Sequence, residues 1–314
     1  MTITDTILRS DYFKDQPPVL VDIGASGEIN AKWKPIAPYC VCLAYDADDR
    51  EFHVTEQTNK TYRKLLTINR IVTAAPVQQT DFYLTASPFC SSLLEPDNGK
   101  LEPWIFSDLF TVQRSTRLHS VTIESSLREA GIGYIDWFKT DTQGTDLRLF
   151  NSLPDHLQAG ILTAELEPGI IDAYKGEDKL FSVMETLPRK GFWLSSMQVM
   201  GIQRLHRNYT AGLSSFVSQR MLRKSPGWAE VTYLRQPFPG TVRQLLLLYV
   251  FAWLEKQYGY ALEIADYAIR QYPSEAIFTE IRTAALKQLR AGQRTAPLVF
   301  LKRQVNKLFS RIHD

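Results

Sequence analysis

The chain has 314 residues, of which 44% are hydrophobic and 22% are charged, and its formal net charge is +2. A chain of this length and composition can bury a core, so we expect one large domain with an appendage, or two domains. The small net charge argues against a nucleic-acid-binding protein.

Three cysteines occur in no metal-ligand spacing and in no disulfide framework. Cys40 and Cys42 are two residues apart in an apolar run, which places both on one face of a strand and favours a core position. The N-terminus lacks the basic and apolar segments of a signal peptide. The longest apolar run, 245–254, is about half the length of a membrane span. Together these features favour a reducing, cytoplasmic location.

Strands and helices alternate through residue 236, which predicts an α/β fold with a mainly parallel sheet and helices on both faces. A short entry helix is expected within 1–18. The expected strands are 19–22, 39–45, 69–75, 81–85, 134–140, 161–165, 191–195 and 229–234. The sheet domain, the first of the two expected, should therefore span residues 1–236.

Helices are expected between these strands. One begins near Glu28 and is kept short by two prolines, and another runs from Asp46 towards Leu66. A third spans 122–130, with Thr122 as N-cap and Gly131 just past its end. A fourth spans 178–189, with an apolar side formed by Phe181, Val183, Met184 and Leu187.

Residues 237–240 form a linker, and the region 241–314 is expected to be helical throughout. This helical region either packs as a small bundle on the sheet domain or contacts a second copy of the chain, as in a homodimer. Its last helix, 297–312, is amphipathic and basic, so contact with an anionic membrane surface is a further possibility.

Three of the expected strands end in an acid. Asp22 is followed by the small-residue turn Ile23-Gly-Ala-Ser-Gly27, Asp46 ends the second strand, and Asp141 begins Asp141-Thr-Gln-Gly144. The carboxyl ends of parallel strands meet at one edge of a sheet. The glycines allow close approach of a ligand, and an acid after the second strand is suited to the two hydroxyls of a ribose. A turn glycine pair with two helix N-caps would explain the same residues without a ligand.

Several segments together resemble the FkbM-type methyltransferases. They cover about residues 19–236 and are Val21-Asp-Ile-Gly-Ala25, Ala44-Tyr-Asp-Ala-Asp48, Phe89-Cys-Ser-Ser-Leu-Leu94, Phe138-Lys-Thr-Asp-Thr-Gln-Gly144, Glu165-Leu-Glu167, Tyr174-Lys-Gly176 and Gly191-Phe-Trp-Leu194. The resemblance implies a Rossmann-like class I fold, S-adenosyl-L-methionine as cofactor, and O-methylation of a hydroxyl on a sugar, glycan or secondary metabolite.

The resemblance also implies roles for individual residues. The methionine end of the cofactor would lie against Asp22, Gly24, Ser26 and Gly27. Asp46 would hold the ribose, and Asp81 would lie near the adenine. Asp141 would lie near the cofactor's amino group or the acceptor, and Glu165 and Glu167 would face the acceptor.

Transfer to a hydroxyl also requires a group that removes its proton, and Asp141, Glu165 and Glu167 are the candidates. His119 and His156 do not follow strand ends, and no cluster has convincing metal-ligand spacing. Ser91 and Ser92 either contact a ligand or are ordinary loop serines. Tyr174 either belongs to a lid or is a packed aromatic.

Two other functions are considered. The glycine turn is one residue shorter than the Gly-Ala-Asn-x-Gly typical of the family, which suggests an inactive methyltransferase-like scaffold that acts through its helical region. A nicotinamide-dependent oxidoreductase is less favoured, because the turn lacks Gly-x-Gly-x-x-Gly.

Overall fold

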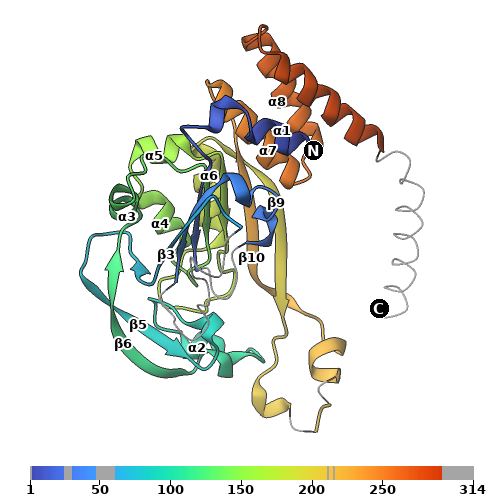
Figure 1. The fold of residues 1–314 in the computed structure, drawn as a ribbon. Helices are drawn as coiled ribbons and strands as arrows, with labels where there is room; N and C mark the ends of the chain where they lie inside the picture. The colour runs from blue at the N-terminus through green and yellow to red at the C-terminus, as the bar shows by residue number, and fades with distance from the viewer. Residues whose placement is uncertain (1, 25–29, 47–60, 211, 215, 292–314) are drawn as a thin grey trace. The chain divides into compact units, whose positions relative to one another are not determined.

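A computed structural model describes residues 2–24, 30–46, 61–210, 212–214 and 216–291 (Figure 1). The chain divides into two compact units. One unit is 13–237, and the other combines 1–12 with 238–314. The expected last helix, 297–312, lies outside the described residues.

The larger unit is built on a seven-stranded sheet in the order β3-β2-β1-β7-β8-β10-β9. Strands β1, β2, β3, β7 and β8 are parallel, and β10 is antiparallel to both of its neighbours. This confirms the α/β class and the mainly parallel sheet. The strands are β1 Val19–Ile23, β2 Val41–Tyr45, β3 Lys64–Ile68, β7 Trp137–Thr140, β8 Thr163–Leu166, β9 Phe192–Ile202 and β10 Ser225–Arg235.

The main core lies on one face of this sheet. Alternate residues of each central strand, such as Val21, Leu43 and Phe138, pack with the apolar sides of four helices. These helices are α3 Ile123–Glu129, α4 Asp146–Ser152, α5 Asp155–Gly160 and α6 Leu180–Arg189. The other residues of the strands point to the opposite face, where Trp137 meets Trp33 edge to face with ring centroids 5.8 Å apart.

A second, three-stranded sheet has the order β4-β6-β5 and lies between β3 and α3 in the chain. Its strands are β4 Ile71–Val72, β5 Gln79–Thr85 and β6 Val112–Val121. The strand expected at 81–85 is therefore confirmed. Between β5 and β6 lie α2 Asn98–Leu101 and two 3₁₀ turns, Pro88–Cys90 and Ser107–Phe110.

The third strand was predicted in the wrong place. Lys64–Ile68 is the third strand of the main sheet, whereas 69–75 is interrupted and only Ile71–Val72 pairs, with β6. The chain turns sharply at Asn69 and Arg70, where the Arg70 amide donates to Ile68 O at 2.9 Å. Most of the helix expected from Asp46 lies outside the described residues, and its expected end near Leu66 is strand.

The remaining helix predictions were partly correct. Thr122 caps α3 by accepting from Ser125 N at 3.2 Å, and Gly131 follows it with φ +69°. The expected start of the helix near Glu28 lies outside the described residues. The chain after it forms the 3₁₀ turns Ala31–Trp33 and Ala37–Tyr39, in keeping with Pro35 and Pro38. On α6, only Val183 and Leu187 of the predicted apolar side are buried, while Phe181 and Met184 are exposed.

The strand expected at 191–195 continues to Ile202, and its partner begins at Ser225, so β9 and β10 form a long hairpin (Figure 1). The region 201–227, predicted to be irregular, therefore includes the strand ends of this hairpin. The peptide bond from Gln236 to Pro237, at the end of the larger unit, is cis.

The smaller unit is helical in its described part. It contains α1 Ile3–Leu8, α7 Val242–Leu254, α8 Tyr258–Gln271 and a helix over 276–291. Tyr249 on α7 donates from its hydroxyl to Ile281 O at 2.8 Å, which ties this helix to the last described one. Residues 1–12 group with this unit and not with the sheet. Among the helices described, none combines the length and apolarity needed to cross a membrane.

Candidate active site

A cavity of about 410 Å³ lies at the carboxyl ends of the central strands of the larger unit. Tyr45 and Asp46 border it at the end of β2, and Asp141 borders it after β7. Strand order reverses between β1 and β7, because β2 and β3 follow β1 on one side and β7 lies on the other. Open α/β sheets bind their ligands in the crevice at such a reversal, and this volume is typical of a small-molecule site.

Gly24 is required by the packing of the strand ends. Its φ is +81°, and a Cβ on it would lie 2.0 Å from the backbone oxygen of Asp141. The Gly24 amide donates to Tyr45 O at 2.9 Å, and the Asp141 amide donates to Ile23 O at 2.9 Å. Backbone contacts therefore join the ends of β1, β2 and β7 directly, and Gly24 lines the cavity that they form.

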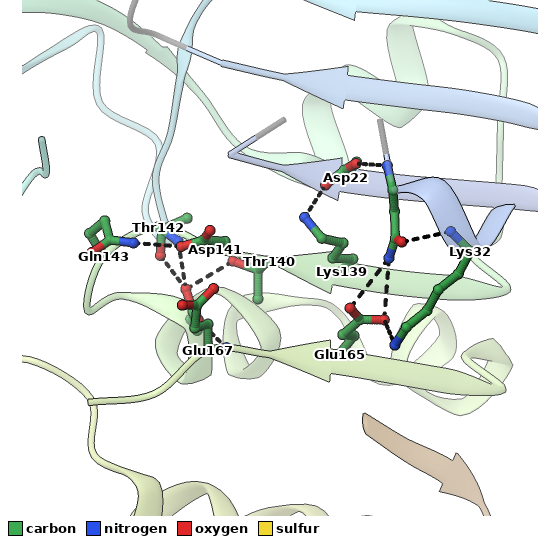
Figure 2. A network of polar contacts seen from close by, with 11 residues as sticks. Asp22, Lys32, Lys139, Thr140, Asp141, Thr142, Gln143, Glu165 and Glu167 are labelled. Carbon is green, nitrogen blue, oxygen red and sulfur yellow. Dashed lines mark hydrogen bonds and ion pairs between the residues drawn. The ribbon is translucent and has the colours of Figure 1, made fainter. Parts of the chain in front are cut away.

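Asp22 is fully buried and forms an ion pair in place of lining the cavity. Lys139 Nζ donates to Asp22 Oδ1 at 2.6 Å, and the Asn30 amide donates to Oδ2 at 3.3 Å (Figure 2). Burial by itself would lower the pKa of Lys139, but the charges of Asp22 and Asp141 raise it above its ordinary value. Asp22 therefore neutralises a partly buried lysine.

Glu165 belongs to the same polar row. Asp22, Lys139 and Glu165 are neighbours in register across β1, β7 and β8. The Glu165 carboxylate accepts from Asn30 Nδ2 at 3.3 and 3.4 Å and from Lys32 Nζ at 3.4 Å (Figure 2). It does not line the cavity. The structure thus separates Glu165 from Glu167, which the sequence had grouped together as acceptor contacts.

Glu167 and Asp141 form a carboxyl pair at the cavity wall. Burial, the charge of Asp141 and a hydrogen bond between the two side chains raise the pKa of Glu167 to about 10. Glu167 therefore carries a proton at neutral pH and donates it in this hydrogen bond. Asp141 Oδ1 also accepts from Gln143 Nε2 at 2.7 Å (Figure 2). The two carboxyl groups are therefore coupled in their titration.

Asp146 organises this pair and was not identified from the sequence. Its Oδ1 accepts from Thr140 Oγ1 at 3.1 Å and from the Thr142 amide and hydroxyl at 2.9 and 2.5 Å. Its Oδ2 accepts from the Glu167 amide at 2.8 Å. The bonds to this one carboxylate fix the chain on both sides of Asp141 and at Glu167. Burial and the charge of Asp141 raise the pKa of Asp146 to about 6. The only signal in the sequence was an acid in the first turn of a helix after Gly144.

Two loops pack on the turn that follows Asp141. Ser92 Oγ donates to Gln143 O at 2.8 Å, so this serine supports the turn. The Tyr174 hydroxyl lies 2.8 Å from Cys90 O and 3.2 Å from Gln143 Oε1, and the side chain is buried. The packed-aromatic interpretation of Tyr174 thus describes its environment. Burial raises the pKa of Cys90 to about 11, which argues against a thiolate nucleophile there.

The other predicted residues are distributed differently. Asp46 is buried and lines the cavity. Asp81 is exposed on β5, 3.7 Å from Arg117 Nε, and does not line the cavity. Ser26 and Gly27 lie outside the described residues. Within the parts of the chain that the structure describes, no three His, Cys, Asp or Glu side chains are grouped to hold a metal ion.

Comparison of the sequence with models of protein families finds no match, and comparison with curated proteins finds no significant match. The functional interpretation of the cavity therefore depends on the chemistry of the residues that surround it.

Proposed function

We propose that the larger unit is an S-adenosyl-L-methionine-dependent methyltransferase that methylates a hydroxyl group. The observation that supports this most directly is the cavity at the strand-order reversal, with Gly24, Asp46 and Asp141 at its wall. These residues belong to the segments that resemble FkbM-type enzymes. The seven-stranded sheet is compatible with the class I fold that the resemblance implies.

The residues at the cavity fit the charge of this cofactor. The Asp46 carboxylate, directly after β2, is suited to accept hydrogen bonds from both ribose hydroxyls. A sulfonium and an ammonium group favour nearby carboxylates, and Asp141 lines the cavity together with Asp46. Arg70 is the only lysine or arginine among the described lining residues. The site therefore favours a cationic ligand.

The carboxyl pair supplies a base beside the hydroxyl that is to be methylated. The bound cofactor would supply an electrophilic methyl group, so positioning of the hydroxyl is the main task of the protein. Because Glu167 retains its proton, Asp141 is the carboxylate that takes the proton from the hydroxyl. Glu167 orients this hydroxyl. Glu165, held by Asn30 and Lys32, has no part in this proposal.

Three free cysteines, all buried, are compatible with a reducing compartment, and the proposed location is the cytoplasm.

Calorimetric titration of the full chain with S-adenosylhomocysteine tests the proposal. We expect binding, and we expect Asp46→Ala to weaken it by about tenfold to hundredfold, because hydrogen bonds to a charged group contribute about 1.5–3 kcal/mol each. Asp81→Ala is the matched control, since Asp81 is exposed and lies away from the cavity.

Failure of the folded wild-type chain to bind at high micromolar concentration would contradict the proposed function and favour an inactive scaffold. Equal affinities for wild type and Asp46→Ala would contradict the ribose contact of Asp46 but not the proposed cofactor.

A further inference from the structure

On the basis of the proposed methyl transfer, we infer that the acceptor has an apolar, aromatic-sized body with few hydroxyls and is not a free sugar. The cavity has two unlike sides. The strand ends supply the carboxylates described above. The opposite side is mainly apolar, and its lining includes the aromatic residues Phe89, Phe106, Phe110, Tyr174 and Trp228.

The aromatic side is a continuous set of ring contacts. Phe106 lies edge to face with Phe110 at a centroid distance of 5.0 Å, and Phe110 meets Tyr174 in the same way at 5.6 Å. Phe106 and Trp228 are nearly parallel, with an interplanar angle of 9° and centroids 6.4 Å apart. These four residues line the cavity together. An apolar ring of a ligand can pack against their faces and edges. Such aromatic pairs contribute binding free energy beyond that of the buried area.

The apolar lining also reaches the solvent. Phe89 is 61% exposed and Leu109 is 46% exposed, and both line the cavity. A ligand that enters past these two side chains meets apolar surface before it reaches the carboxyl pair. Covering that surface is favourable for an apolar ligand in proportion to the area removed from water.

Three polar side chains of the lining, Ser91, Gln143 and Glu177, already have partners within the protein. Ser91 Oγ accepts from the Thr85 amide at 3.2 Å. Gln143 is bonded to Asp141 and Tyr174. Glu177 Oε1 accepts from the Ala173 amide at 2.7 Å and from Lys179 Nζ at 2.5 Å. Each sugar hydroxyl buried here without a new partner would weaken binding by about fivefold to 150-fold. A single hydroxyl placed at Asp141 and Glu167 avoids that cost.

Two probes of the full chain distinguish these acceptor classes by calorimetry. One is 2-naphthol, which has a planar apolar body and one hydroxyl, and the other is methyl β-D-glucopyranoside. We expect 2-naphthol to bind at least about tenfold more tightly, as expected for burial of its apolar surface. Phe89→Ser should weaken 2-naphthol binding by about fivefold, because it removes part of the apolar entrance. Phe89 is exposed, so this change leaves the core intact.

Phe181→Ser is the matched control. Phe181 is 72% exposed on α6 and does not line the cavity, so its loss should leave 2-naphthol binding unchanged. Equal or tighter binding of the glucoside, no binding of 2-naphthol, or equal effects of the two Phe→Ser changes would each overturn the inference. Titration of the same samples with S-adenosylhomocysteine distinguishes failure of this inference from failure of the proposed function. Binding of that compound with failure of 2-naphthol would leave the methyltransferase proposal standing.

Discussion

Gly24→Ala is expected to lower the free energy of unfolding of the larger unit by at least about 4 kcal/mol, or to prevent its folding. The new Cβ would lie 2.0 Å from Asp141 O, where Cβ atoms essentially never approach closer than 3.0 Å. The obstacle is backbone, and it is held by the bond from the Asp141 amide to Ile23 O. Separating the atoms therefore requires β1 and β7 to part at the edge where the cavity lies.

Gly131→Ala provides the matched control for this change. Gly131 has a similar φ of +69°, but a Cβ on it would meet no atom within 4 Å. It should therefore show only the strain of the left-handed backbone, about 1–2 kcal/mol. Thermal unfolding of both variants separates the two contributions. Similar losses in the two variants would mean that the strand ends relax easily around position 24.

The main sheet could be predicted because its central strands are short apolar runs bounded by turn residues. Val19-Leu-Val-Asp-Ile23 and Val41-Cys-Leu-Ala-Tyr45 are buried along their whole length, as continuous apolar runs in parallel sheets are. The third strand was misplaced for a local reason. Both 64–68 and 69–75 contain β-branched or aliphatic residues, and only the turn at Asn69 and Arg70 decides which of them joins the sheet.

The candidate site could be predicted only in part. Asp46 and Asp141 reach one cavity because the ends of neighbouring parallel strands converge. Glu165 does not reach it, because its register next to Lys139 places it in the polar row with Asp22 and Lys139. Sequence position relative to a strand end does not reveal that register. Asp146 was missed because its role depends on a bond to Glu167, 21 residues further along the chain.

The aromatic side of the cavity could not be predicted for a similar reason. Phe106 and Trp228 are more than a hundred residues apart, and their contact depends on how the segment before β6 packs against β10. No local periodicity records such a contact. The chemistry of the strand ends was therefore accessible from sequence, whereas the surface that would select an acceptor was not.

Glu167→Gln is expected to reduce the loss of folding stability that accompanies a rise in pH. The wild-type Glu167 has a pKa of about 10 in the folded chain, against an ordinary value of 4.5. Between these values the unfolded chain releases a proton that the folded chain retains, so stability falls as pH rises from about 4.5 to about 10. Glutamine has no proton to release, and its amide can still donate to Asp141, so the variant lacks this loss.

The difference in Tm between Glu167→Gln and wild type should therefore grow from pH 6 to pH 8. A full proton would correspond to about 1.4 kcal/mol for each pH unit, and we expect a total gain of about 1–2 kcal/mol because Asp141 and Glu167 titrate as a pair. Asp146, with a pKa of about 6, also lowers folding stability as pH rises. That loss of stability is largely complete by pH 6 and is common to both proteins.

Glu185→Gln is the matched control, since Glu185 lies exposed on α6, where Arg189 Nη2 is 2.8 Å from its Oε1. Its Tm difference from wild type should stay constant over the same pH range. A constant difference for Glu167→Gln as well would mean that Glu167 is ionised in the folded protein. Glu167 would then itself become a candidate for removing the acceptor's proton.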